Sequence, residues 1–374
     1  MLIYIQDLIK KIHIVSFDIP FPADYGGVVD VFFKIKALCE LGVSIHLHCF
    51  QYGRKESSEL LELCDKVTYY KRKKSFLHLL SRKPFVVNTR INKQLLANLL
   101  KDDSPVLLEG LHCSWYIPFL KLKGKKVFFR AHNIEHHYYQ ELASAESSFL
   151  KKIYYRLEAY KLQNQENVLA HSSGIFCISP NDFSYFENRY SKAIFIPAFH
   201  SNNKVFSLLG RGNYALYHGN LSVAENVKAV KFLVNEVFDS LEIPLIVAGK
   251  SPCKELLKMN SANVTIVSNP SELELAELVQ KAHMNVLPSF QSTGIKLKLL
   301  FALFNGRYCL ISPQLMPSKK ILKTAIICDS AQQWKDKIIE TSNLKFGADD
   351  LIERETYARE FDNLIQANKL IEWI

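Results

Sequence analysis

Residues Pro288 to Gly306 read P-S-F-Q-S-T-G-I-K-L-K-L-L-F-A-L-F-N-G, and this stretch decides the fold class. It follows an apolar run, His283 to Leu287, that predicts a buried strand, and its leucines then recur at helical spacing. The segment therefore predicts a strand, a short loop with Gly294, and a helix. Free backbone N–H groups at the start of that helix, beside Lys296 and Lys298, are suited to an anion such as a phosphate. An ordinary crossover with solvated lysines is the alternative.

Short β-branched or aromatic runs alternate with helical patterns from one end of the chain to the other. This alternation predicts an α/β fold with parallel sheets that helices cover on both faces. Six strands in each half favour two doubly wound, Rossmann-like domains over one closed barrel. The expected strands are 12–17, 44–50, 67–70, 106–109, 126–130 and 175–179, then 214–218, 244–248, 264–267, 284–287, 308–311 and 325–328. The expected helices include 28–41, 226–240, 271–282 and 298–304.

A polar stretch rich in glycine, asparagine and serine, Pro197 to Gly212, has no clear period and is interpreted as a linker. We therefore expect an N-terminal domain over residues 1–198, a C-terminal domain over 212–345 and a helical tail over 346–374. The tail is amphipathic, and the first domain is one surface on which it can pack. Two doubly wound domains in tandem usually bind a ligand between them, at the carboxyl ends of their strands.

The net charge of +10 is concentrated in the first half of the chain. Residues 1–200 hold 27 lysines and arginines against 19 aspartates and glutamates, and the densest clusters are Lys71–Lys74 and Lys121–Lys126. An anionic membrane surface, an anionic acceptor or a nucleic acid could each use this charge, and a merely solvated basic face is the remaining alternative. No RNA-binding motif accompanies the clusters, so we expect no nucleic-acid partner.

The eight cysteines are scattered and form no CxxC pair. This pattern favours buried thiols in a reducing cytosol over a disulfide framework or a zinc site. The N-terminus lacks the features of a signal peptide, and no run of about 18 apolar residues predicts a spanning helix. We expect a cytoplasmic protein, with docking on a membrane surface left open.

Two loops that follow predicted strands in the first half carry candidate binding residues. Gly26 and Gly27 begin a helix, where paired glycines let a ligand approach the backbone. His132 follows the strand at 126–130, so it can hydrogen-bond a substrate hydroxyl. The spelling H-x-x-E-H from His132 to His136 matches an inverted zinc-protease motif, but that motif needs one continuous helix, and Asn133 is typical of a helix N-cap. We therefore expect no metal site; a plain turn and a structural histidine are the alternatives.

The second half offers two further loops. Gly219 lies in H-G-N-L at the end of one predicted strand, and Gly249 with Lys250 ends the next. A glycine beside a lysine is suited to a phosphate, and a solvated loop lysine is equally consistent with the pattern. Neither GxGxxG nor a Walker sequence occurs, so the chain has no support as a nicotinamide or P-loop protein.

Residues 133–171 form an unusually long helical region that is rich in tyrosine. We expect its rings to form a core-facing aromatic stripe. An exposed face for a lipid or a partner is the alternative.

Five motifs, in this order, resemble the GT-B glycosyltransferases, and within them the large retaining family 4, the glycosyl transferases of group 1. The first half carries P-A-D-Y-G-G at 22–27 with L-x-x-L-G-V at 38–43, and R-A-H-N-I-E-x-x-Y-Y at 130–139. The second half carries H-G-N-L at 218–221, A-G-K-x-P at 248–252 and S-T-G-I-K-L-K-L-L-x-A-L-x-x-G at 292–306. The resemblance covers nearly the whole chain and implies two Rossmann-like domains that face a central cleft.

The activity that the resemblance implies is transfer of a hexose, such as mannose, from a nucleotide sugar with retention. The donor would be UDP- or GDP-linked, and no metal or other cofactor would be required. The acceptor would be a glycan or a lipid-linked glycan in cell-surface polysaccharide synthesis. The basic first domain would face that acceptor or make a peripheral membrane contact.

The resemblance also assigns roles to individual residues. His132 matches the histidine that contacts the transferred sugar, and it is the predicted catalytic residue. Aimed N–H groups and lysines would stabilise the charge that develops on a departing diphosphate. The predicted donor-binding residues are Gly26, Gly27, Gly219, Lys250, Thr293, Gly294, Lys296 and Lys298.

Two departures from the family pattern bear on activity. The E-x7-E element aligns with Thr293 and Phe301, so neither carboxylate is present, and the second normally holds the nucleotide ribose. The basic pair that normally neutralises the diphosphate aligns with Asn220 and Asn226. A non-catalytic scaffold or binding protein of the same fold is therefore the main alternative. A sugar-nucleotide epimerase is a third, with Glu109 as the one candidate for its base.

Overall fold

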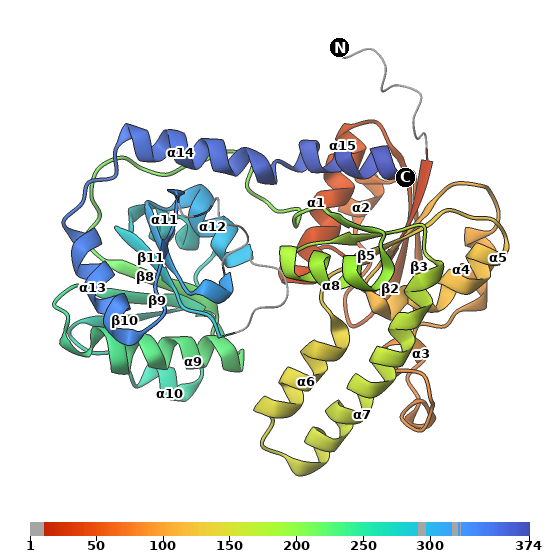
Figure 1. Ribbon diagram of the computed structural model, residues 1–374, viewed down its shortest axis with the longest axis horizontal. Helices are drawn as coiled ribbons and strands as arrows, with labels where there is room; N and C mark the ends of the chain where they lie inside the picture. The colour runs from red at the N-terminus through yellow and green to blue at the C-terminus, as the bar shows by residue number, and fades with distance from the viewer. Residues whose placement is uncertain (1–10, 291–296, 316–320, 322) are drawn as a thin grey trace. The chain divides into compact units, whose positions relative to one another are not determined.

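The computed structural model describes residues 11–290, 297–315, 321 and 323–374, and the chain divides into two compact units. The first unit contains the residues up to Ser201 and also the C-terminal segment Phe361–Ile374. The second contains the described residues between Asn202 and Glu360. Each unit is built on its own parallel sheet (Figure 1).

The first unit has a seven-stranded parallel sheet in the order β3-β2-β1-β4-β5-β6-β7. Its central strands are buried on both faces because helices cover both sides. Along β1, Ile12 and Ile14 belong to the core shared with α1 and α15, whereas Val15 belongs to the core on the other face. The strands are β1 (Lys11–Ser16), β2 (Ser44–Gln51), β3 (Lys66–Lys71), β4 (Val106–Glu109), β5 (Val127–Ala131), β6 (Gly174–Cys177) and β7 (Ala193–Phe195).

The second unit has a six-stranded parallel sheet in the order β10-β9-β8-β11-β12-β13. Its core includes the buried Trp334 and Tyr217, packed against the aliphatic residues of the central strands. The strands are β8 (Ala215–Asn220), β9 (Leu245–Lys250), β10 (Val264–Ser268), β11 (Met284–Leu287), β12 (Tyr308–Ile311) and β13 (Ile326–Ile327).

Local sequence signals set several helix ends. Ser179 caps α8 just before Pro180, and Ser271 forms a capping box with Glu274 at the start of α11. The helices of the first unit are α1 (Gly26–Glu40), α2 (Ser58–Leu63), α3 (Phe85–Asn88), α4 (Lys93–Leu99), α5 (Ile117–Leu122), α6 (Glu135–Ala145), α7 (Phe149–Glu166), α8 (Pro180–Tyr190) and α15 (Asn363–Trp373), with the short turn η1 (Phe76–His78). Those of the second are α9 (Ala224–Phe232), α10 (Lys254–Leu257), α11 (Glu272–Lys281), α12 (Leu297–Asn305), α13 (Ala331–Ser342) and α14 (Ala348–Ala358).

The expected strands all form, with ends that differ by at most two residues. The expectation of six strands in the first half is wrong, because β7 adds a seventh at the sheet edge. It has only three residues and is partly exposed, so it lacks the buried run that predicts a strand. The helix expected at 226–240 ends at Phe232 and continues as a π turn and a 3₁₀ turn.

The tyrosine-rich region forms a helical hairpin, α6 followed by α7, that projects from the first unit (Figure 1). The core-facing stripe expected there is wrong in large part. Phe149 and Tyr160 are exposed, and Tyr138, Tyr154 and Tyr155 line a pocket, whereas Tyr139 lines the pocket and also packs against the core. Leu162 of α7 lies in that core, but most of the aromatic rings of the hairpin face outward or toward the pocket.

The C-terminal helix α15 packs against α1 within the first unit. Ala367, Leu370 and Ile371 lie in the same core as Ile14 of β1. The Lys126 ammonium also donates to the Ile374 backbone oxygen at 3.2 Å. The chain therefore completes the first core only with its last residues.

Candidate functional site

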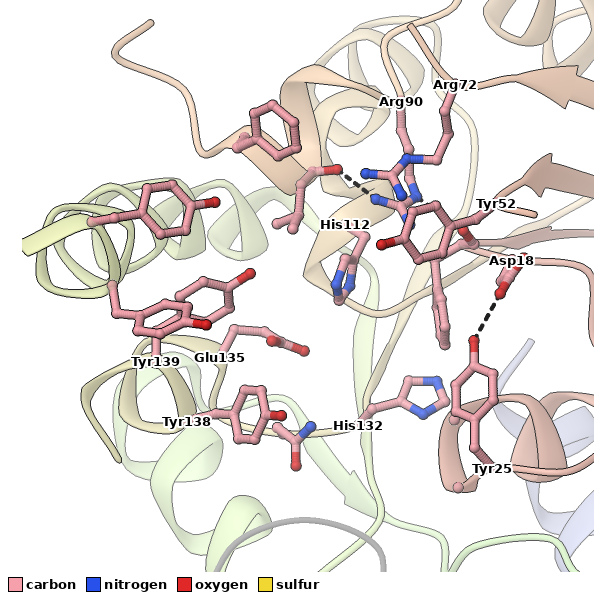
Figure 2. Close-up of a pocket in the computed structure, with 18 residues that line it drawn as sticks. Asp18, Tyr25, Tyr52, Arg72, Arg90, His112, His132, Glu135, Tyr138 and Tyr139 are labelled. Atoms are coloured by element: carbon pink, nitrogen blue, oxygen red, sulfur yellow. Dashed lines mark hydrogen bonds between the residues drawn. The ribbon is translucent and has the colours of Figure 1, made fainter. Parts of the chain in front are cut away.

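The first unit contains a pocket of about 690 Å³ at the carboxyl ends of β1 and β5 (Figure 2). Loops that follow these strands, the start of α1 and the α6–α7 hairpin all contribute to it. Its polar lining includes Asp18, Arg72, Arg90, His112, His132, Asn133 and Glu135. Its aromatic lining includes Phe17, Tyr25, Tyr52, Phe85, Tyr138, Tyr139, Tyr154 and Tyr155.

His132 follows β5, as the sequence predicted, and lies at the wall of this pocket. Its Nε2 is 2.9 Å from Oε2 of Glu109, which ends the neighbouring strand β4. Burial would raise the pKa of Glu109, but Lys34 and the His132 hydrogen bond hold that pKa below its ordinary value. The ionised carboxylate must accept from Nε2–H, so in the neutral ring Nδ1 carries the lone pair. This Nδ1 has no hydrogen-bond partner among the described residues.

Behind His132 lies a buried network of four charged side chains. Lys34 bridges Glu109 at 2.8 Å and Asp30 at 3.0 Å. Arg130 donates two hydrogen bonds to the Asp30 carboxylate, from Nη2 at 2.7 Å and from Nε at 3.0 Å. Burial would raise the pKa of Asp30, but Arg130 and Lys34 hold that pKa far below its ordinary value. Two carboxylates and two cations balance, so the network fixes the orientation of His132 at no net charge.

The described residues offer two groups of side chains close enough to share a metal ion. In the first, ligand atoms of Asp30, Glu109 and His132 lie within 4.8 Å of one another, but Lys34 and Arg130 already neutralise the carboxylates. The inverted zinc-protease arrangement is not formed either. His132 precedes α6 and contacts Glu109, whereas His136 lies within α6 and pairs with Glu166 at 3.2 Å.

The second group is His13, His46 and His48, which lie side by side on β1 and β2. Hydrogen bonds run from the Tyr70 hydroxyl to His48 Nδ1, from His48 Nε2 to His13 Nδ1, and from His13 Nε2 to Asp102, each at 2.9 Å. Burial lowers the pKa of His48 to about 2 and that of His46 to about 4. Neutral rings of His13 and His48 satisfy all three of these hydrogen bonds. We therefore interpret the cluster as a structural hydrogen-bond relay.

Arg90 and His112 lie across the pocket from the tyrosines of the hairpin, and Glu135, at the start of α6, lies beside Tyr138 and Tyr139 (Figure 2). Arg90 is almost fully buried and donates to the backbone oxygens of Phe17 at 2.9 Å and Val86 at 2.8 Å. Burial raises the pKa of Glu135 to about 7, although Arg90 opposes the shift. Burial keeps the pKa of His112 well below its ordinary value, and the positive charge of Arg90 lowers it further. The pocket thus pairs a fixed cation with a carboxyl that titrates near neutrality.

Gly26 and Gly27 both line this same pocket, at the first turn of α1. A Cβ on Gly27 would lie 2.7 Å from the ring of Phe17, so the ring leaves no room for a side chain. The preceding Tyr25 is anchored because its hydroxyl donates to Asp18 at 2.9 Å. The structure therefore brings together His132, Gly26 and Gly27 from the predicted set.

In the second unit, Gly219 and Lys298 meet at the carboxyl end of β8. The Lys298 ammonium lies 3.4 Å from Oδ1 of Asn226 and 5.5 Å from the Tyr217 ring centre. A Cβ on Gly219 would lie 3.2 Å from the same Asn226 side chain. The exposed Lys250 ends the adjacent strand β9. Thr293, Gly294 and Lys296 lie outside the described residues, so their predicted roles stay predictions.

Phe301 occupies the position where the family pattern places a ribose-binding carboxylate. Its ring meets the ring of His218 edge-on at 5.6 Å and packs against the core with Leu216 and Ala248. Burial, and then Lys298, lower the pKa of His218 to about 3, and its Nε2 has no hydrogen-bond partner among the described residues. At the carboxyl end of β8, a buried neutral imidazole therefore packs against the apolar ring that stands at the carboxylate position.

Sequence reasoning missed Asp30, Lys34, Arg90 and His112. One signal was available for the first pair. Asp30 and Lys34 are spaced i, i+4 among the apolar residues Val31, Ile35 and Leu38 on the buried face of α1. A charged pair on such a face must find partners in the core. Arg90 gave no such signal, because only the folded chain brings α3 beside β1.

Comparison with known proteins agrees with the motifs. A family model described as Glycosyl transferases group 1 matches residues 212–343, which span the sheet of the second unit. The resemblance to group 1 glycosyltransferases is confirmed. A curated relative, the uncharacterized 44.6 kDa protein in the cps region of Klebsiella pneumoniae, is 26% identical over 325 residues, which are 80% of this chain and 81% of that protein.

Solved structures show the same fold. An α,α-trehalose-phosphate synthase (UDP-forming) from Burkholderia xenovorans, in complex with glucose-6-phosphate, aligns with a TM-score of 0.65 at 10% identity over 97% of this chain and 99% of that chain. An E. coli trehalose-6-phosphate structure bound with UDP-2-fluoro glucose aligns with a TM-score of 0.65 at 9% identity over 97% and 98%. At these identities the likeness concerns the fold, and the GT-B class expected from the sequence is confirmed.

Proposed function

We propose that the chain is a retaining glycosyltransferase that moves a hexose, mannose or a similar sugar, from a UDP- or GDP-linked donor to a glycan or lipid-linked acceptor. The match of the second unit to the group 1 family model carries the reaction class. The relative from a cps region supports a place in cell-surface polysaccharide synthesis. Fold neighbours bound with UDP-2-fluoro glucose and with glucose-6-phosphate support a nucleotide-sugar donor and a sugar acceptor.

The donor would be held by the second unit. Lys298 and Lys250 supply positive charge at the strand ends, and Gly219 lies beside the Asn226 side chain that Lys298 contacts. Thr293, Gly294 and Lys296 complete the site in this proposal. Charge on the leaving diphosphate grows in the transition state, so these cations stabilise that state more than the bound donor, without a metal ion.

The first unit would position the sugars. Nδ1 of His132, with Nε2 held by Glu109, is suited to accept a hydrogen bond from a sugar hydroxyl. Glu135 is suited to bind an acceptor hydroxyl when it is ionised. Four tyrosines of the hairpin, which we call the tyrosine wall, offer flat apolar faces on which sugar rings pack: Tyr138, Tyr139, Tyr154 and Tyr155.

Isothermal titration with UDP, GDP and their hexose conjugates tests the proposal. We expect one of the two nucleotide series to bind, and Lys298→Gln to weaken that binding about tenfold, because one cation near the diphosphate is lost. Lys254→Gln, an exposed lysine of the same unit, is the matched control. A chain that binds neither series would contradict the proposed function.

A non-catalytic scaffold is the second candidate, and Phe301 motivates it. An apolar ring replaces the hydrogen bonds that a carboxylate would give the ribose. Donor binding without release of nucleoside diphosphate, across a panel of acceptors, would favour the scaffold. Turnover that depends on His132 would exclude it.

A further inference from the structure

Large apolar side chains gather on the outer surface of two segments of the first unit. Around η1, Phe76 is 89% exposed and Leu80 is 85% exposed. On α7, Phe149 is 74% exposed, and exposed apolar residues recur along one side of the helix. Contiguous exposed apolar surface marks an interaction site more often than chance would give. We name this set the basic-apolar surface: Phe76, Leu77, Leu80, Phe149, Leu150, Ile153, Leu157 and Tyr160, with the cationic residues described next.

The exposed charge of the same two segments is positive. Between Asp65 and Asp102 the chain has ten lysines and arginines and no acidic residue. Between Glu146 and Glu158 it has three basic residues and no acidic one. Seven of these basic residues are exposed and lie next to η1 or on α7: Lys71, Lys73, Lys74, Arg82, Lys83, Lys151 and Arg156.

The two segments form one surface because they are tied together. The Lys161 ammonium on α7 donates to the backbone oxygen of Leu79 at 2.9 Å. Glu158, one turn earlier, accepts from the backbone N–H of Phe85 at 2.6 Å. Glu158 is buried and also pairs with Lys161, so it adds no exposed negative charge to the surface.

This surface lies on the outside of elements whose inner sides line the pocket. Phe85 and Val86 follow the η1 segment, and Tyr154 and Tyr155 lie on α7 between its exposed apolar residues. A molecule held at the outer surface is thus one helix thickness away from the tyrosine wall.

We propose that the basic-apolar surface docks the first unit on an anionic lipid bilayer, so that the acceptor is a lipid-linked sugar that enters the pocket beside α7. Interleaved cationic and large apolar side chains match a bilayer interface, where phosphate headgroups overlie acyl chains. No described helix is long and apolar enough to cross a membrane. A second copy of this chain is a poor occupant, because two such surfaces would bring like charges together.

Flotation of the full-length protein with vesicles tests the docking. We expect binding to vesicles of phosphatidylcholine and phosphatidylglycerol, weaker binding to phosphatidylcholine alone, and loss of binding as NaCl rises from about 0.1 M to about 0.5 M. The variant K73Q/R82Q/K83Q should bind the anionic vesicles at least about tenfold more weakly. The variant F76S/L80S should lower binding by about tenfold or more, because two inserted side chains are lost.

Matched controls come from the second unit. Lys254→Gln with Lys258→Gln, and Leu273→Ser, remove exposed charge and an exposed leucine there, and both should bind like the wild type. A Phe149→Trp probe should shift its emission to the blue with anionic vesicles, whereas Leu273→Trp should not. Equal binding by all variants, or no binding to anionic vesicles, overturns the proposal. So does a surface variant that changes the oligomeric state seen by light scattering.

The docking does not depend on the proposed function, whereas the acceptor class rests on it. None of the substituted residues lines the pocket, so donor hydrolysis in detergent-free solution should be unchanged in K73Q/R82Q/K83Q. Vesicle binding without any turnover would contradict the proposed function but support the docking. Turnover without vesicle binding would do the opposite.

Discussion

His132 owes its orientation to charges that lie behind it rather than to its own loop. The motif placed His132 at the end of a strand, and the structure confirms that position. The motif did not show that Glu109 would fix the ring, because the pairing joins two strands across the sheet. Glu109 does not line the pocket, so the epimerase alternative lacks its one candidate base.

Replacement of Lys34 by Met should strongly lower the free energy of unfolding of the first unit. The substitution leaves Asp30 paired with Arg130 alone and leaves Glu109 with only the His132 hydrogen bond. Breaking a buried ion pair in this way costs about 3–5 kcal/mol. Lys36→Met, an exposed lysine on the same helix, should change the free energy of unfolding by less than about 0.5 kcal/mol. Urea denaturation of both variants is the measurement, and equal midpoints would contradict the buried network.

Glu135 should make the protein less stable as pH rises. Its pKa of about 7 in the folded chain lies above the unfolded value near 4.5, so the folded state binds more protons between these two pH values. Stability from this group is complete below about pH 4.5 and is lost as pH rises through about 7. Glu135→Gln, which mimics the protonated form, should gain about 1–3 kcal/mol over the wild type at pH 8 and little at pH 4.5. Thermal unfolding at both pH values measures this, with the exposed Glu40→Gln as the control.

At the scale of elements, the strands were predictable and the surface of the hairpin was not. A buried parallel strand leaves an apolar run that sequence reveals directly, as at β4 and β11. The spacing of tyrosines on α6 and α7 shows a face but not what covers it. In the structure most of these rings meet a cavity or solvent, although Tyr139 packs against the core, so the core-facing expectation failed in large part.

The histidine relay between β1 and β2 should make the first sheet sensitive to acid. Burial lowers the pKa of His46 to about 4, whereas the unfolded chain titrates near 6.5. The stability that its neutral form contributes is present above pH 6.5 and is lost as pH falls through about 4, by up to about 1.4 kcal/mol per pH unit. His46→Gln removes this proton, so its stability should fall less steeply over that window. Denaturant midpoints from pH 7 to pH 4 test this, and parallel curves for wild type, His46→Gln and the exposed control His171→Gln would refute it.

At the scale of the whole molecule, the chain returns to its first unit after building the second. The amphipathic pattern predicted helices in the tail, but their partner surface was open. The structure places α14 in the second unit and α15 in the first. Sequence could not distinguish these places, because both helices present an apolar stripe of the same kind.

The last helix should therefore stabilise the first core. Leu370→Ala removes a fully buried side chain from the contact with α1 and should cost about 2–4 kcal/mol. Leu364→Ala, a partly exposed leucine of the same helix, should cost less than about 1 kcal/mol. Hydrogen exchange of the first unit under increasing denaturant measures the free energy of unfolding of both variants. Equally small losses in the two variants would show that α15 is not part of that core.

The residues of the pocket in the first unit differ in how far sequence could predict them. His132, Gly26 and Gly27 were named from one motif each, and they meet in one pocket. Arg90 and Glu135 gain their properties from burial that no local pattern reports. The donor loop at 291–296 lies outside the described residues, so its part in the donor site remains a proposal.

The most direct test of the central claim is release of nucleoside diphosphate from the nucleotide sugar that binds, measured with wild type, His132→Ala and the exposed control His171→Ala. The proposed role of His132 predicts turnover by the wild type and the control, and a loss of about 10²–10³-fold in kcat for His132→Ala with donor affinity nearly unchanged. Wild-type activity in His132→Ala would contradict the assignment of this pocket as the site of sugar transfer.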